Sequence, residues 1–169
     1  MKRFSIEIKW SLIFAIMNLV WALIAKALNF DDTAIQYGQL FNTLILIPAF
    51  VLYLLAGFDK RKNYYDGIIS YKQALGSGLI LSVFVAFLGL ITTWLSVSVI
   101  SSDLFANTIQ YVTSTGQMTA AEAQQQFNLG SFMIIGFFAA PVTGLILSLI
   151  TSAIVKTKKS QTLATTKIA

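Results

Sequence analysis

The chain has 169 residues, of which 56% are hydrophobic and 11% are charged. A soluble globular domain carries roughly 25% charged residues, so this composition indicates one domain that lies in a membrane. The sequence has no cysteine and no histidine, which excludes disulfides, thiolate nucleophiles and the commonest zinc and iron ligands. The net charge is +5, but the basic residues flank apolar runs and form no separate basic domain, which argues against a nucleic-acid partner.

Four apolar runs are long enough to cross a bilayer, which takes about 20 helical residues. Their approximate ranges are 8–28, 40–58, 75–101 and 131–155. They lack the alternation of a transmembrane β-strand, and lipid offers no partner for an unpaired backbone group, so the runs are predicted as helices. The predicted fold class is an all-α integral membrane protein, a four-helix transmembrane bundle that forms a single domain over residues 1–159.

The basic residues predict an orientation for the four spans. Eleven of the twelve lie before or at the start of the first run, between the second and third runs, or after the fourth, and Lys26 alone lies near the other end of the first run. Because Lys and Arg are enriched in cytoplasmic loops, both termini are expected in the cytoplasm. The polar tail at 160–169 is expected to be a disordered cytoplasmic segment.

The first run has a second interpretation, as a secretory signal peptide. Ala25-Lys26-Ala27 resembles a small-x-small cleavage site. The run is long for a signal peptide, and Glu7 and Lys9 make an atypical start. We therefore expect the first run to stay in the protein as a span, whereas cleavage would leave three spans.

The segment at 102–130 is the largest stretch outside the predicted spans. Asp103 is predicted to cap a short helix that ends at Gly116, and Thr119 with Glu122 forms the capping box of a second helix. With the orientation above, this short helical segment is extracytoplasmic.

Small side chains recur every four residues along the fourth run, and a shorter series occurs in the third. A face of small residues lets another helix approach closely. We expect this packing inside the bundle, and a homodimer seam through the fourth helix is the alternative. The predicted helix-packing residues are Gly136, Ala140, Gly144, Ser148, Ser152, Gly78, Ser82 and Ala86.

Polar residues are scarce at membrane depth. No Asp, Glu, Arg or His lies within the four runs, which argues against ion-coupled transport. Pro48 is expected to kink the second helix near Leu44, and Pro141 to kink the fourth, because proline has no backbone N–H to donate. Static kinks are expected, and the hinges of a gate are the alternative. Asn18 and Asn42 also lie at this depth, and a polar cavity lined by both would support a carrier or channel.

No pattern of residues predicts a catalytic centre. Asp31 and Asp32 are neighbours without a nucleophilic partner nearby in sequence, and neither metal-ligand spacing nor a glycine-rich phosphate loop occurs. We therefore expect no enzyme, no cofactor and no metal site. Lys60, Arg61 and Lys62 form a cluster that either contacts anionic lipid head groups or only fixes the topology.

Two segments carry a family resemblance. One is Asn63-Tyr-Tyr-Asp-Gly-Ile-Ile-Ser-Tyr-Lys-Gln-Ala-Leu-Gly-Ser-Gly, and the other is the end of the fourth run from Pro141. Together they resemble the bacterial membrane family catalogued as domain of unknown function 4199, over nearly the whole chain. The resemblance implies a multi-pass protein of the inner membrane of Gram-negative bacteria with no assigned activity. It also implies an envelope role, since genes of this family often lie near genes for membrane glycosyltransferases.

Three functions are compatible with these observations. The leading hypothesis is a non-enzymatic scaffold or accessory subunit in the cell envelope that contacts a membrane-protein partner. The first alternative is a carrier or channel for a neutral or lipidic solute. The second is a role in lipid-linked sugar metabolism, as an accessory to a glycosyltransferase; an enzyme of that kind would need at least two titratable groups that converge at one membrane face.

Overall fold

The computed structural model describes residues 4–157, and every regular element within that range is helical. Four helical segments are long and apolar enough to cross a membrane, in agreement with the predicted spans: Ser5–Ala27, Ile35–Asn63, Tyr71–Ile100 and Leu129–Val155. They extend beyond the apolar runs, because helical hydrogen bonding continues past the point at which hydrophobicity ends. The predicted disordered tail at 160–169 lies outside the described residues.

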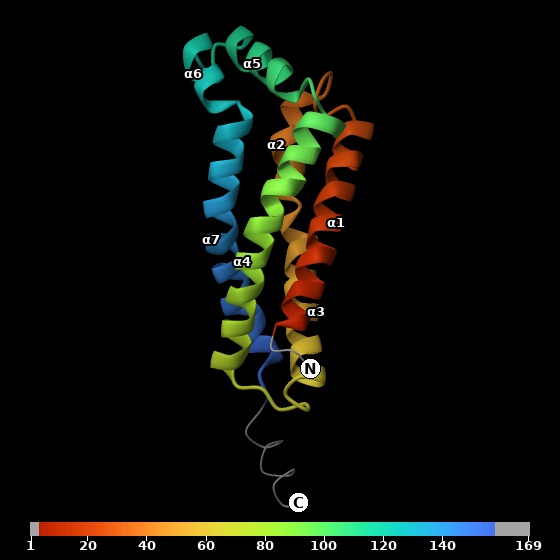
Figure 1. The fold of residues 1–169 in the computed structure, drawn as a ribbon. Helices are drawn as coiled ribbons and strands as arrows, with labels where there is room; N and C mark the ends of the chain where they lie inside the picture. The colour runs from red at the N-terminus through yellow and green to blue at the C-terminus, as the bar shows by residue number, and fades with distance from the viewer. Residues whose placement is uncertain (1–3, 158–169) are drawn as a thin grey trace, which may run out of the picture.

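The four long segments form a bundle in which each runs in the opposite direction to the one before it in the chain (Figure 1). Helix α1 (Ser5–Ala27) packs against α3 (Leu46–Asn63) and α4 (Tyr71–Leu95), and α7 (Leu129–Val155) packs against the same two helices. The contact between α4 and α7 is the most extensive one in the bundle. We refer to the end at which α1 begins and α7 ends as the basal end, and to the opposite end as the apical end.

Two short helices, α5 (Leu104–Ser114) and α6 (Ala120–Gln126), lie across the apical end (Figure 1). The predicted capping box of α6 is confirmed, since Thr119 and Glu122 each bond the backbone N–H of the other. The predicted cap of α5 is wrong: Asp103 precedes the helix, but its backbone is helical (φ −91°, ψ −1°) and its side chain caps no N–H. A capping side chain needs an extended backbone to reach back to the helix start.

The second transmembrane segment is interrupted near Leu44, where Pro48 is expected to produce a kink. A 3₁₀ turn at Ile35–Tyr37 leads into α2 (Gly38–Thr43), and α3 begins only at Leu46. Pro48 cannot donate to the carbonyl of Leu44, and the N–H of Ile47 bonds that carbonyl instead at 3.0 Å. Helix α7, by contrast, is continuous through Pro141.

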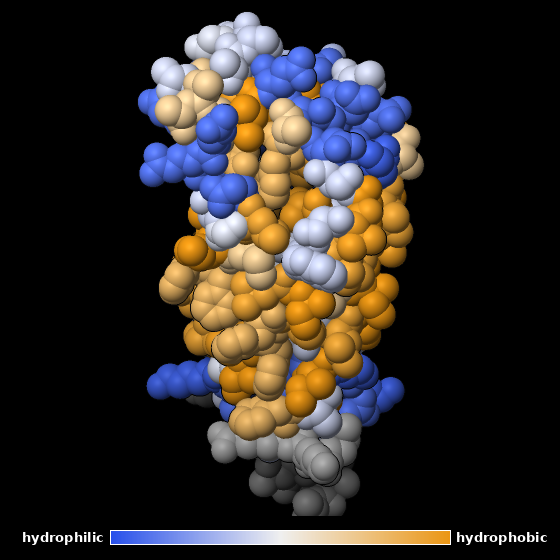
Figure 2. All heavy atoms as spheres, turned by 45° about the horizontal axis from the view of Figure 1, so that its top comes forward, coloured by the Kyte–Doolittle hydropathy of each residue, from blue (hydrophilic) through white to orange (hydrophobic). Residues whose placement is uncertain are grey.

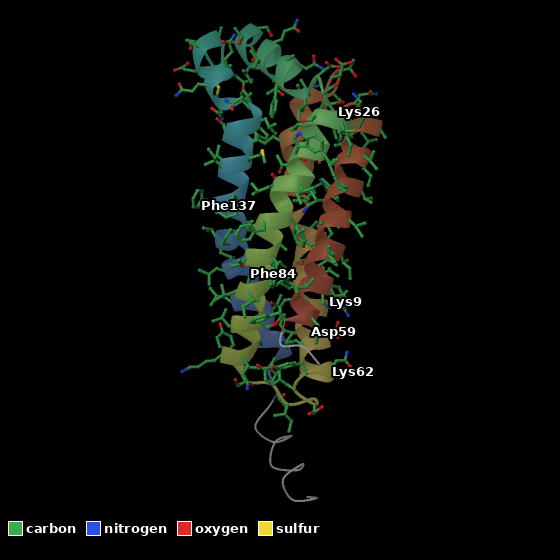
Figure 3. All side chains as sticks on the ribbon, in the orientation of Figure 1. Lys9, Lys26, Asp59, Lys62, Phe84 and Phe137 are labelled. Carbon is green, nitrogen blue, oxygen red and sulfur yellow. The ribbon has the colours of Figure 1, made fainter. Side chains whose placement is uncertain are left out.

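Polar and apolar residues divide along the bundle axis. Figure 2 shows a hydrophobic belt with hydrophilic residues toward both ends. Lys26 lies at the apical end, whereas Lys9, Asp59 and Lys62 lie at the basal end (Figure 3). Every basic residue of the described range except Lys26 lies on the basal part of a helix or, as Lys156 does, directly after the basal end of one. This distribution is the one expected of a protein that crosses a membrane four times.

Candidate functional site

The apical half of the bundle encloses a cavity of about 460 Å³. Ligand sites of proteins commonly measure 300–1,000 Å³, so this apical cavity is large enough for a small organic molecule. All four long segments contribute to its wall, and so do Asn18 and Asn42. Asn18 and Asn42 thus share one cavity, as expected of a carrier or channel, but most of the lining is apolar rather than polar.

The lining of the apical cavity changes along its length. Its basal floor consists of hydrophobic side chains, including Phe14, Val85 and Leu147, and of Tyr53, whose ring packs edge-on against Phe14 at 6.2 Å. Toward the apical end the wall carries uncharged hydrogen-bonding groups. These are the side chains of Asn18, Asn42, Thr92, Thr93, Ser96 and Ser101.

Glycines and a π-helical turn keep the apical half open. Residues 129–143 of α7 include none that is buried. Gly89 of α4 and Gly136 of α7 both line the cavity, and no side-chain or backbone atom lies within 4 Å of the position of a Cβ at either one. Beyond α4 the chain widens into a π-helical turn at Ser96–Ile100. Such turns are rare and often occur at functional sites.

An ion pair lies at the apical end of the cavity. Lys26 Nζ donates to Asp31 Oδ2 at 2.7 Å, and Asn107 of α5 donates to the backbone carbonyl of Asp31 at 2.8 Å. Asp31 lines the cavity and is 3% exposed. Within residues 4–157, neither Asp31 Oδ1 nor the buried indole Nε1 of Trp21 has a hydrogen-bond partner. Trp21, which stacks on Phe41 at 4.5 Å, also lines the cavity.

The basal half is closed by contacts between small residues. A methyl group on Gly78 of α4 would overlap Ser148 Oγ and lie 2.8 Å from Ser148 Cβ. A methyl group on Gly144 of α7 would overlap Ser82 Cβ and lie 2.6 Å from the Tyr53 hydroxyl. Real side chains do not approach so closely, so α4 and α7 meet here only because both glycines lack a side chain.

The predicted helix-packing residues therefore fall into two groups. Gly78, Ser82, Gly144 and Ser148 lie where α4 meets α7, and Ser152 and Ala86 are buried nearby on the same two helices. Gly136 and Ala140 line the apical cavity instead. The basal part of the α7 series thus faces α3 and α4 of the same chain, which leaves the exposed Gly136 as the member accessible to a second copy.

A buried ion pair joins α1 to α3 in the basal half. Lys60 Nζ lies 2.9 Å from Glu7 Oε1, and the two side chains are 4% and 2% exposed. Ser77 of α4 donates to the same Glu7 oxygen at 2.6 Å, and Lys60 Nζ lies 3.9 Å from the centre of the Tyr64 ring. Sequence reasoning missed this pair. The sequence did contain a signal, because Glu7 stands one position before the first apolar run and Lys60 stands two positions after the second.

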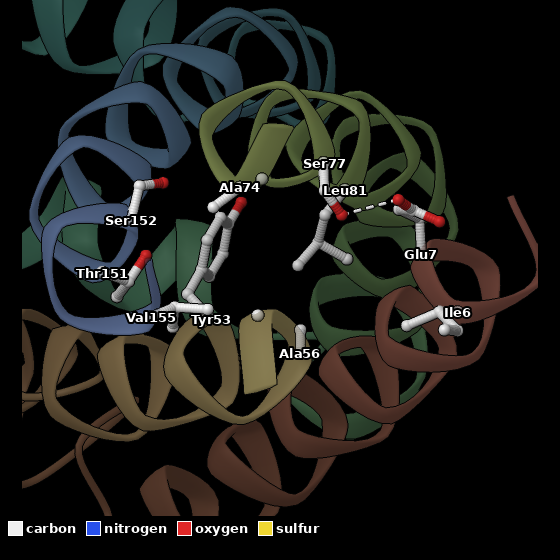
Figure 4. A pocket seen from close by; sticks show the side chains of 12 residues that line it. Ile6, Glu7, Tyr53, Ala56, Ala74, Ser77, Leu81, Thr151, Ser152 and Val155 are labelled. Atoms are coloured by element: carbon white, nitrogen blue, oxygen red, sulfur yellow. Dashed lines mark hydrogen bonds between the residues drawn. The ribbon is translucent and has the colours of Figure 1, made fainter. Parts of the chain in front are cut away.

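A second, much smaller cavity of about 10 Å³ lies beside this ion pair. Figure 4 shows Glu7 and Ser77 on one side of it, and Thr151 and Ser152 of α7 on the other. Its volume is about that of one water molecule. Tyr53 lines both cavities and is 4% exposed, so its side chain stands between them.

The predicted lipid-binding cluster is dispersed in the structure. Lys60 is held by Glu7, and Arg61 donates to the carbonyl of Val155 at 3.0 Å. Lys62 is exposed. Only Lys62 of the three therefore presents its charge outward, which is a weak basis for recognition of an anionic head group.

Acidic groups do not gather into a metal site within residues 4–157, where no three of His, Cys, Asp and Glu lie close enough to hold an ion. Asp31 pairs with Lys26 at the apical end, and Asp59 pairs with Lys9 at the basal end. Three carboxylates of the described chain, those of Glu7, Asp31 and Asp59, thus carry ion pairs in separate parts of the bundle.

Taken together, the architecture is that of a multi-pass helical membrane protein with an internal cavity. The sequence matches the family described as protein of unknown function DUF4199 over residues 9–157. The chain belongs to that family, which confirms the resemblance inferred from its sequence motifs. No curated protein and no solved structure matches it.

Proposed function

We propose that this protein is a non-enzymatic carrier that binds a lipidic solute in the apical cavity. The observation that carries the proposal is the cavity of about 460 Å³ that all four long segments enclose. Helices that exist only to span and pack fill such a space with side chains, because an empty internal volume costs stability. Here the glycines at 89 and 136 leave it open.

The position of the cavity supports a lipidic rather than a water-soluble solute. Asn42 and Leu46 line it on one side and Gly136 and Ala139 line it on the other, and all four remain exposed. Helices α3 and α7 contact each other in the basal half, where the Tyr53 hydroxyl lies against Gly144 and Val155 lies against Gly57. This arrangement supports lateral entry from the surrounding lipid.

The proposal is tested by filling the cavity from α4. Gly89→Phe places a ring in the cavity, whereas Gly76→Phe on the same helix places one where nothing lies within 4 Å and outside the cavity lining. The probe is a diazirine-bearing oleyl alcohol, irradiated with the protein in lipid nanodiscs. We expect labelling of cavity residues such as Met133 to fall about tenfold in Gly89→Phe and to stay unchanged in Gly76→Phe. Equal labelling of both variants would overturn the proposal.

A scaffold or accessory role in the cell envelope, including one beside a glycosyltransferase, is a second candidate. It is favoured by α6, most of whose residues are exposed and polar or small although its capping box holds it as a helix. Such a helix at the apical end offers a surface to a partner. Repeated purification with one stoichiometric partner would support this role, and a lone monomer in every mild detergent would count against it.

We also propose the membrane orientation that the charges favour, with the basal end and both termini in the cytoplasm of a bacterial inner membrane. Helices α5 and α6 are then extracytoplasmic. Because the sequence has no cysteine, single thiols introduced by Lys62→Cys and Gln125→Cys report on the two sides. We expect an impermeant maleimide to label only Gln125→Cys in intact cells, and labelling of Lys62→Cys alone would reverse the orientation.

A further inference from the structure

The apical cavity contains no uncompensated charge. Asp31 is the one charged residue in its lining, and the carboxylate accepts a hydrogen bond from Lys26 at 2.7 Å. Lys26 itself does not line the cavity, and the other basic residues of the described range lie in the basal half. An anionic group in this cavity would therefore meet a carboxylate and no cation, at a depth where an unpaired charge is costly.

The hydrogen-bonding groups of the cavity are amides and hydroxyls. Asn42, Thr93 and Ser96 each offer a donor and an acceptor, and they lie apical to the hydrophobic floor at Phe14 and Leu147. The lining thus changes from apolar near mid-membrane to polar near the apical end. A lipid of the apical leaflet has the same gradient, with its chain toward the middle and its head group toward the surface.

Two buried polar atoms that lack a hydrogen-bond partner narrow the chemical class of the ligand further. Among the residues that the structure describes, Trp21 Nε1 lacks an acceptor and Asp31 Oδ1 lacks a donor, although both residues line the cavity. Buried polar atoms are nearly always hydrogen-bonded. A hydroxyl both donates and accepts, so a hydroxyl-bearing head group has the chemistry to pair with either atom.

We infer that the apical cavity selects an amphiphile with an uncharged, hydroxyl-bearing head group, held near Asp31 with its hydrocarbon chain against the floor at Tyr53. This inference rests on the proposed function, and it adds the chemical class of the ligand. It makes the charge of the head group the property that decides binding.

The test compares four photoreactive probes that share one oleyl chain and differ only in the head group. They are the alcohol, the carboxylate, the primary amine and the headless alkene, each present at the same mole fraction in nanodiscs. Labelled peptides are mapped by mass spectrometry. We expect the alcohol to label cavity residues about tenfold more than each of the other three, a ratio that corresponds to about 1.4 kcal/mol.

Two variants connect this preference to Asp31. Asp31→Asn removes the carboxylate and leaves Lys26 without its partner, so labelling by the carboxylate probe is expected to rise relative to the alcohol. Asp32→Asn removes the neighbouring, exposed carboxylate and is expected to leave the order of the probes unchanged. If the two variants behave alike, the role of Asp31 is refuted.

The outcomes separate this inference from the proposed function. If no probe labels the cavity above the level seen at lipid-facing Phe138, the carrier proposal itself fails. If the probes label the cavity but the carboxylate, the amine or the alkene equals the alcohol, the cavity binds lipid without reading its head group, and only the present inference is overturned.

Discussion

The apical and basal halves of the bundle are built from the same four helical segments, yet they pack in opposite ways. In the basal half, Gly78 and Gly144 bring α4 and α7 into contact through Ser148 and Ser82, and the cavity beside Glu7 measures only about 10 Å³. In the apical half, a glycine of the same α7 series, Gly136, faces a cavity of about 460 Å³. Hydrophobicity does not distinguish the two halves, because both belong to apolar spans.

The difference shows that a face of small residues allows two helices to pack closely but does not by itself bring them together. The face becomes a contact where the opposite helix also presents small residues, as Ser82 does to Gly144. Where the opposite helix lies farther away, as it does beside Gly136, the same series of small residues borders a cavity. In lipid there is no hydrophobic force between helices to close such an opening, so packing and polar contacts decide the separation.

The largest expected effect comes from breaking the buried ion pair of the basal half. Lys60→Met leaves Glu7 buried without a cation, and the loss of one partner of such a pair typically costs about 3–5 kcal/mol of unfolding free energy. The double variant Glu7→Gln with Lys60→Met is expected to recover most of that loss. Reversible unfolding in mixed micelles measures both. The exposed Lys62→Met is the control, and a destabilisation equal to that of Lys60→Met would show that the pair has no special weight.

The second effect comes from adding bulk to the α7 series at two levels. Gly144→Leu forces α4 and Tyr53 away and is expected to lower the unfolding free energy by about 1–3 kcal/mol. Gly136→Leu enters the open apical cavity and is expected to be neutral or stabilising, since leucine favours a helix over glycine by up to about 1 kcal/mol. The same unfolding assay compares them, and similar losses at both positions would mean that the two halves do not differ in packing.

A smaller effect is expected at the apical end, where Asn107 connects α5 to the carbonyl of Asp31. Asn107→Ala removes this bond, at a net cost of about 1 kcal/mol, and is expected to increase amide hydrogen exchange in α5 while exchange in α4 stays unchanged. Gln110→Ala changes an exposed residue of the same helix and serves as the control. Uniform acceleration throughout the bundle would contradict a local role.

The smallest effect is a pH dependence at α6. Hydrogen bonds from the hydroxyl and backbone N–H of Thr119 hold the pKa of Glu122 below its ordinary value. A carboxylate with a lowered pKa stabilises the folded state above its ordinary pKa, and this contribution is lost as the pH falls through the lowered value. Amide exchange in α6 is therefore expected to rise in acid, and Thr119→Ala is expected to remove most of that change. An unchanged acid response in Thr119→Ala would refute the assignment.

The features that the sequence predicts correctly are local ones. The four spans, the place near Leu44 where Pro48 disturbs the second helix, and the capping box of Thr119 and Glu122 each depend on residues within one turn or one apolar run. The Asp103 cap failed although its residue type suits that position, because the chain leaves the π-helical turn with a helical backbone at Asp103.

The ion pair and the cavity depend on several helices at once. Glu7 and Lys60 are 53 positions apart, and only the rotation and depth of α1 relative to α3 bring them together. The apical cavity exists because the side chains do not fill the space between the separated helices. Neither the separation of the helices nor the filling of that space can be inferred from the sequence of a single span. Asn18 and Asn42 marked the depth of the site in advance, but their presence in a shared cavity required the packed bundle.

The position of Tyr53 has an electrical consequence. Because its side chain closes the apical cavity halfway along the bundle, the hollow is a blind recess and the basal half remains a continuous insulating plug. A water-filled cavity would then place most of a membrane voltage across that plug, which contains Glu7 and Lys60 at its far side. A bound lipid chain would instead restore the insulating thickness of the whole bundle.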